Sequence, residues 1–213
     1  MPTKLFIQLF FLVFLNSCTI SNVMNSYEGI KEFFISNEIN INKKAIRESE
    51  LITIVLTLNN QDEQIGVLVT ENEKSQIWAT SQNKILYSKN GKITKTKGFD
   101  FDFEILNYAS IFKDKHKSSA FIRFFEPDSS YLEINYSISL IKTGFMKEPL
   151  SDEVFTYSLY EEDFFVPAIG WKGKNYYWVD NEGHTWISKQ QISPFNDKFR
   201  IEVLKKMAGN PAI

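Results

Sequence analysis

Five side chains near the C-terminal end of the sequence could together bind a sugar: Trp171, Tyr177, Asp180, Trp186 and Gln190. Sugar rings have apolar C–H faces that suit flat aromatic rings. Their hydroxyl edges suit carboxylate and amide groups such as those of Asp180 and Gln190. The alternative is that the aromatic rings belong to the core, since Trp and Tyr each bury about 150–250 Å². The exposure of these rings therefore decides between a glycan-binding site and a packed interior.

Three consecutive acids, Glu161, Glu162 and Asp163, could supply carboxylates for the hydrolysis of a glycan. A glycosidase needs two carboxylates roughly 5–10 Å apart on either side of a cleft. A run of acids between two strands is more typical of a solvated turn, and no second acid can be placed opposite this run. We therefore predict that the protein is not an enzyme, with glycan hydrolysis as the remaining alternative.

The other motifs exclude several further kinds of chemistry. His116 lies in a charged stretch and His184 stands alone beside aromatics, and two separated histidines do not make a zinc site of the usual type. The sequence contains no glycine-rich phosphate loop and no Gly-x-Ser-x-Gly nucleophile elbow. A formal net charge of −2 gives no indication of a nucleic-acid partner. We therefore predict no cofactor and no metal.

The single cysteine, Cys18, follows a segment with the layout of a signal peptide. Lys4 precedes an apolar stretch, Leu5–Leu15, which as a helix would be about 16 Å long. That is too short for a hydrocarbon core of about 30 Å, so the stretch is a signal rather than a membrane span. The residues Leu15-Asn16-Ser17-Cys18 resemble the lipobox of bacterial lipoproteins, in which the cysteine thiol receives a diacylglyceryl group. The alternative is an ordinary secreted protein with a chance cysteine near its cleavage site.

Lipid on Cys18 would make a membrane the first partner of the chain. The assignment divides the sequence into a signal peptide over residues 1–17 and a β-rich periplasmic domain over residues 18–213. Thr19, rather than Asp, follows the cysteine, which in enterobacterial sorting favours the outer membrane. We therefore expect a periplasm-facing anchor in the outer membrane, with the inner membrane and the cell surface as alternatives.

Elements that position these residues are mostly short strands. The helical spacing of apolar residues over Thr19–Ser36 predicts one amphipathic helix. From Leu51 onward, strands recur with turn signals at eight to twelve residues, which indicates an antiparallel β architecture. We expect a sandwich or a partly open barrel with an N-terminal helix, and a short C-terminal one if residues 199–204 are not a strand. The expected strands are 51–58, 66–70, 75–80, 84–88, 92–96, 120–125, 131–141, 154–160, 163–166, 176–179 and 185–188.

Turns and loops separate these strands. Asn90-Gly91 predicts a tight turn, because both residues tolerate a positive φ. Residues 104–112 could form a short helix, and residues 143–151 look like a loop. In the last hairpin we expect Val179 to face His184 and Tyr177 to face Trp186, which would place all four on one face of the sheet.

Two blocks of the sequence resemble the YjbF/GfcB lipoproteins, which are encoded with bacterial exopolysaccharide and group 4 capsule systems. In the first block, that family has a Trp-containing strand, a hairpin that ends in Asn-Gly-Arg and a Thr-x-Gly motif shortly after it. In the second block it has Tyr-Trp-Val-Asp, followed by Gly, Trp-x-Ser-x-Gln and Pro. Two positions depart from the family pattern. Lys92 stands where the family usually has Arg, and Gly173-Lys174 stands where a more hydrophobic or Arg-containing segment is expected before the second block. The matching residues are 77–81, 90–99, 176–180, Gly183, 186–190 and Pro194.

The resemblance implies a mostly β periplasmic domain on the outer membrane, working without known catalysis in polysaccharide production or export. Its partners would be a polysaccharide or proteins of an export machine. A second hypothesis is a carrier or chaperone that shelters a lipid or lipoprotein in a concave sheet. A carrier of that kind should have a deep, Phe-lined cavity open to solvent.

Overall fold

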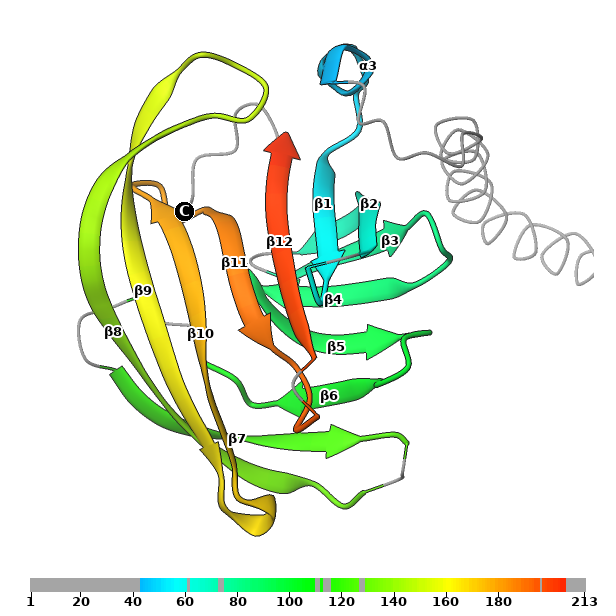
Figure 1. Ribbon diagram of the computed structural model, residues 1–213, viewed down its shortest axis with the longest axis vertical. Coiled ribbons are helices and arrows are strands. Elements are labelled where there is room, and N and C mark those ends of the chain that lie inside the picture. The colour runs from blue at the N-terminus through cyan, green and yellow to red at the C-terminus, as the bar shows by residue number, and fades with distance from the viewer. Residues whose placement is uncertain are drawn as a thin grey trace, which may run out of the picture. The chain divides into compact units, whose positions relative to one another are not determined.

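The computed structural model describes residues 43–60, 62–72, 75–109, 112, 116–126, 129–195 and 197–205. Cys18, the predicted signal peptide over residues 1–17 and the predicted helix over residues 19–36 lie outside these residues. Within them, twelve antiparallel strands form a closed barrel (Figure 1). Each strand pairs with the strands before and after it in sequence, and β1 pairs with β12 to complete the circuit. Among the described residues, no helix has the length and apolar character needed to cross a membrane.

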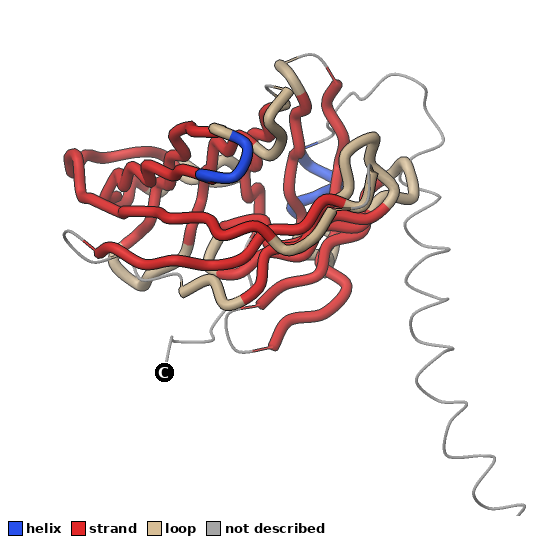
Figure 2. Tube along the Cα trace, turned by 90° about the horizontal axis from the view of Figure 1, so that it is seen from below, coloured by secondary structure: helices blue, strands red, loops and turns tan. Residues whose placement is uncertain are grey.

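In the part of the chain that the structure describes, most residues are in strands and the helical segments are short (Figure 2). In order, the elements are α3 (Lys43–Glu48), β1 (Thr53–Leu58), β2 (Asp62–Asn72), β3 (Ser75–Thr80), β4 (Ile85–Lys89), β5 (Lys92–Lys97), β6 (Phe103–Leu106), β7 (His116–Phe124), β8 (Leu132–Lys147), β9 (Val154–Val166), the 3₁₀ turn η1 (Pro167–Ile169), β10 (Trp171–Asp180), β11 (Thr185–Gln191) and β12 (Lys198–Lys205).

Alternation along each strand places the core inside the barrel. On β7 and β8 the buried positions are every second residue: Ala120, Ile122, Phe124, Ile134, Tyr136 and Ile138. The residues between them, such as Phe121 and Asn135, point to the outside, because successive side chains of a strand face opposite sides. A smaller apolar cluster joins Ile46 of α3 to Leu150 at the tip of the β8–β9 hairpin.

The Asn90-Gly91 turn is confirmed, with φ of 49° at Asn90 and 78° at Gly91. Glycine is required at the second position for two reasons. L side chains rarely adopt that φ, and a Cβ on Gly91 would lie 2.5 Å from Cβ of Thr185. The turn therefore holds the start of β5 directly against β11.

Several expected elements were wrong in kind. Closure of the sheet excludes the sandwich, and the barrel is complete rather than partly open. Residues 143–147 continue β8 instead of forming a loop, and the two strands expected over 154–166 are one, β9. Residues 103–106 form β6 where a helix was considered. For residues 199–204 the strand alternative is confirmed, because they belong to β12.

Candidate functional site

The five residues proposed from sequence as a glycan site do not form an exposed platform. Tyr177 is 0% exposed, Gln190 2%, Trp186 3% and Trp171 6%, so no sugar can stack on these rings. Trp186 donates from Nε1 to Oδ2 of Asp180 at 2.9 Å, and its ring centroid lies 4.8 Å from that of Phe155. These residues are part of the packed structure, which is the alternative that their sequence pattern left open.

The register of the last hairpin also differs from the one expected. Val179 pairs with Thr185 and Tyr177 with Ser188, because an irregularity between Trp178 and Val179 shifts the pairing. Trp186 therefore does not face Tyr177. Strict two-residue alternation cannot anticipate such a bulge.

Asp180 organises the turn of this hairpin. Its Oδ1 accepts hydrogen bonds from the backbone N–H groups of Glu182 and His184, each at 2.9 Å. Burial alone would raise the pKa of Asp180, but hydrogen bonds from His184 and Trp186 outweigh it and lower the pKa to about 2. Asp180, Glu182 and His184 also place one metal-ligating atom each within 4.8 Å of one another. Both Asp180 oxygens are already hydrogen-bonded, which accounts for this grouping without an ion.

A polar network lies inside the barrel, around Glu162. Nζ of Lys92 lies 3.2 and 3.1 Å from the two carboxylate oxygens of Glu162. Asn175 donates to Oε2 at 3.0 Å and the Tyr177 hydroxyl donates to the same oxygen at 2.5 Å. Burial, followed by the nearby negative charge of Glu162, raises the pKa of Tyr177 well above its ordinary value. Tyr177 therefore stays protonated and acts as a donor to the carboxylate.

Gln190 links the two sequence blocks that carry the family resemblance. Its Oε1 accepts from the Ile93 backbone N–H at 2.9 Å, and its Nε2 donates to the Gly91 carbonyl at 2.7 Å and to Ser188 Oγ at 2.9 Å. The Asn-Gly-Lys turn and the Trp-x-Ser-x-Gln strand are thus two sides of one buried contact. Sequence spacing alone gave no sign of it, because 97 residues separate Ile93 from Gln190.

The acidic run is not a solvated turn but the middle of strand β9. Glu162 points into the barrel, while Glu161 and Asp163 lie on the outside within 2.6 and 3.2 Å of Lys174 Nζ. Hydrogen bonds from Lys174 lower the pKa of Glu161. Because Glu162 and its two neighbours lie on opposite sides of the sheet, they do not face one another across a cleft as a glycosidase requires.

The inside of the barrel at this level is filled. The enclosed space lined by Lys92, Phe103, Phe164, Trp171 and Gln190 measures about 10 Å³. A volume of that size holds about one water and no lipid. This part of the interior is therefore unlike the deep, Phe-lined cavity that the carrier hypothesis requires.

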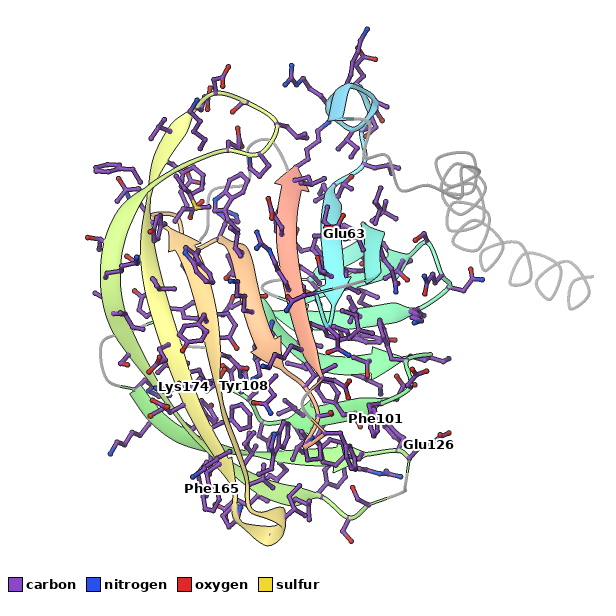
Figure 3. All side chains as sticks on the ribbon, in the orientation of Figure 1. Glu63, Phe101, Tyr108, Glu126, Phe165 and Lys174 are labelled. Atoms are coloured by element: carbon purple, nitrogen blue, oxygen red, sulfur yellow. The ribbon has the colours of Figure 1, made fainter. Side chains whose placement is uncertain are left out.

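A depression on the outer face of strands β7 to β10 is a candidate ligand-binding surface. Its volume is about 660 Å³, and it is open to solvent. Figure 3 labels Phe165 and Lys174, which come from β9 and β10. Outward-facing residues that line it are Lys117, Asn135, Ser137, Asp163, Phe165, Lys172 and Lys174. We call this surface the β7–β10 depression; sequence analysis missed it, because it requires the register of four strands.

A solved structure shares this fold. The crystal structure of the hypothetical lipoprotein YmcC from Escherichia coli (K12) superposes with a TM-score of 0.69 at 17% sequence identity, over 79% of this chain and 91% of that one. A protein described as a lipoprotein from Parabacteroides distasonis gives a TM-score of 0.37 at 12% identity, over 73% and 93% of the two chains. Comparison with curated protein sequences finds no match.

The sequence itself matches a family model over most of its length. Residues 27–204 match the model described as group 4 capsule polysaccharide lipoprotein GfcB, YjbF. The matched region contains strands β1 to β11, all but the last residue of β12, the Asn90-Gly91 turn and Gln190. The chain therefore belongs to the YjbF family of group 4 capsule polysaccharide lipoproteins.

Proposed function

We propose that this protein is a lipid-anchored, periplasm-facing component that acts without catalysis in the production or export of a capsule or exopolysaccharide. The observation that carries the proposal is the family match over residues 27–204. The lipobox at Cys18 supports the anchor, and we place it in the outer membrane because Thr19 follows the cysteine. The barrel would then be a binding body held at the membrane, in contact with a polysaccharide or with proteins of the export machinery.

Two features of the barrel support binding rather than catalysis. The acids of β9 are divided between the inside and the outside of the sheet, so they cannot act on one bond together. The open β7–β10 depression offers an aromatic ring, amide and hydroxyl groups and lysines on one surface. That combination suits recognition of an extended polar chain more than the enclosure of a small substrate.

Deletion of the gene in its native host tests the proposal. We expect the amount of surface polysaccharide to fall while the lengths of glycan chains incubated with the purified protein stay unchanged. Normal polysaccharide in the deletion strain would refute the assigned role, and shortening of added glycan would refute the absence of catalysis.

The anchor has its own test. Cys18→Ser should move the protein from the membrane fraction to the soluble periplasmic fraction, and mass spectrometry of the wild-type chain should find acyl groups on Cys18. Cys18→Ser should also lower surface polysaccharide if attachment is needed for function. An unmodified thiol on Cys18 in the native protein would contradict the anchor.

A further inference from the structure

Phe165 stands at the centre of a row of side chains on the outer face of the barrel. It pairs with Asn135 of β8 on one side and with Lys172 of β10 on the other. Directly opposed residues in antiparallel strands have their Cβ atoms about 4.5–5.5 Å apart, so the three side chains are immediate neighbours on one face. Phe165 is 44% exposed, which leaves part of its ring open to a ligand. An aromatic face, an amide and an ammonium group therefore lie side by side.

A second row lies two residues along the strands and is more strongly charged. Lys117 pairs with Ser137, Ser137 with Asp163, and Asp163 with Lys174. Lys174 is held by Glu161 and Asp163 at 2.6 and 3.2 Å, and its hydrogen bonds to these acids raise its pKa to about 12. This lysine is already neutralised by the protein and is not the group that a ligand would find.

The other two lysines of the depression are not neutralised in this way. Neither Lys117 nor Lys172 forms an ion pair with any residue that the structure describes. Three lysines against Glu161 and Asp163 leave a local charge of +1, whereas the whole chain carries −2. The depression is therefore a locally cationic surface on an acidic protein, which favours an anionic ligand.

We propose that the β7–β10 depression binds an acidic polysaccharide chain whose sugars carry carboxylate groups. One sugar ring stacks on Phe165, its carboxylate reaches Lys172 or Lys117, and its hydroxyls bond to Asn135 and Ser137. This inference rests on the proposed function and names the class of glycan. A neutral glycan would leave the two lysines without a role. A purely anionic ligand such as a phosphate chain would leave the aromatic ring without one.

Binding of oligogalacturonate to the full chain in detergent tests the proposal by calorimetry at low salt. A malto-oligosaccharide of equal length is the neutral probe, and inorganic polyphosphate is the anionic probe without sugar rings. We expect Lys172→Gln and Lys117→Gln each to weaken oligogalacturonate binding about fivefold, the loss of one exposed charge-assisted hydrogen bond. Phe165→Ala should weaken it by at least as much, and Phe165→Tyr should restore it.

The matched control residues lie on the β8–β9 hairpin, which also carries Asn135 and Phe165, but outside the depression. Lys142→Gln removes an exposed lysine and Phe145→Ala an exposed aromatic ring, and neither residue lines the depression. Both variants should bind oligogalacturonate as the wild type does. All six variants change exposed residues, so unfolding by urea should show equal stability and confirm that each is folded.

Three results would overturn the proposal. The wild-type chain could fail to bind oligogalacturonate, or the control variants could weaken that binding as much as the variants in the depression do. Polyphosphate could also bind as tightly as oligogalacturonate, with an affinity that Phe165→Ala does not change. Measurements in cells separate this inference from the proposed function. If gene deletion lowers surface polysaccharide but Phe165→Ala combined with Lys172→Gln does not, the function stands and the binding site is wrong. If deletion itself has no effect, the function is wrong.

Discussion

Inside the barrel, Nζ of Lys92 lies 3.1 Å from Oε2 of Glu162, and this ion pair joins β5 to β9, two strands that are not neighbours in the sheet. Both side chains are buried. Removing one partner of a buried ion pair leaves the other charge uncompensated, at a cost of about 3–5 kcal/mol. We therefore expect Glu162→Gln to lower the free energy of unfolding in urea by an amount in that range.

The matched control for this change is Asp163→Asn, on the same strand. Asp163 pairs with the exposed Lys174, and a surface ion pair contributes at most about 1 kcal/mol. Replacing Lys92 by Met in the Glu162→Gln background should recover part of the lost stability, because no unpaired charge then remains. Equal losses for Glu162→Gln and Asp163→Asn would show that the buried pair does not stabilise the barrel.

Gly91→Ala should be strongly destabilising, for steric reasons beyond the cost of its positive φ. Holding a non-glycine residue in the left-handed region costs about 1–2 kcal/mol, and overlap with Thr185 adds to it. Gly183 is the control, since its φ is 85° and nothing lies within 4 Å of an added Cβ. Thermal unfolding should show a larger loss for Gly91→Ala than for Gly183→Ala. In a Thr185→Gly background, the melting temperatures of the Gly91→Ala and Gly183→Ala proteins should differ less. An unchanged difference would count against the steric explanation.

Gln190→Leu should loosen the contact between β5 and β11. The substitution removes the acceptor for the Ile93 N–H and the donor for the Gly91 carbonyl, and each buried group left without a partner costs about 1–3 kcal/mol. Hydrogen exchange should therefore speed up at the Ile93 amide. Gln76→Leu is the comparison, because the hydrogen bond that Gln76 donates to Glu71 is exposed and the one that it accepts from Ser88 is only partly buried. Unchanged exchange at Ile93 would rule out the bridging role of Gln190.

We predict that Asp180 makes a contribution to the free energy of unfolding that is lost in acid. Its pKa falls from the ordinary 3.8 to about 2 in the folded protein, so its contribution is complete above pH 3.8 and disappears as the pH falls through about 2. Asp180→Asn should lower the melting temperature at pH 5 and flatten its dependence on pH between about 4 and 2. Asp152→Asn, at a solvent-exposed carboxylate, serves as control. An Asp180→Asn protein with the wild-type pH dependence would contradict this assignment.

Local signals in the sequence predicted many of the strands and one of the turns. β3 was predicted to the residue, and Asn90-Gly91 was placed because both residues tolerate positive φ. Closure was not predictable, because it depends on pairing between β1 and β12 at opposite ends of the domain. Residues 143–147 were missed because they extend β8 into a hairpin whose exposed residues show no apolar alternation.

The candidate sites show the same division between local and long-range information. The chemistry of Tyr177, Trp186 and Gln190 was evident from residue type, but their burial depends on which way the last hairpin faces. Conversely, Phe165, Asn135 and Lys172 are unremarkable in the sequence and become neighbours only through the register of three strands. The resemblance to the family was confirmed by the match over residues 27–204, although Lys92 stands where Arg is usual.

Every strand in the described part of the chain has hydrogen-bonded neighbours on both sides. Among the described residues, no strand therefore lies at the edge of an open sheet, where an incoming strand from another protein would add. The weakest join of the barrel is between β5 and β6, where one residue pair, Lys95 with Glu104, connects the two strands. Unless that join opens, recruitment of the barrel into a larger assembly depends on side chains on its outer wall.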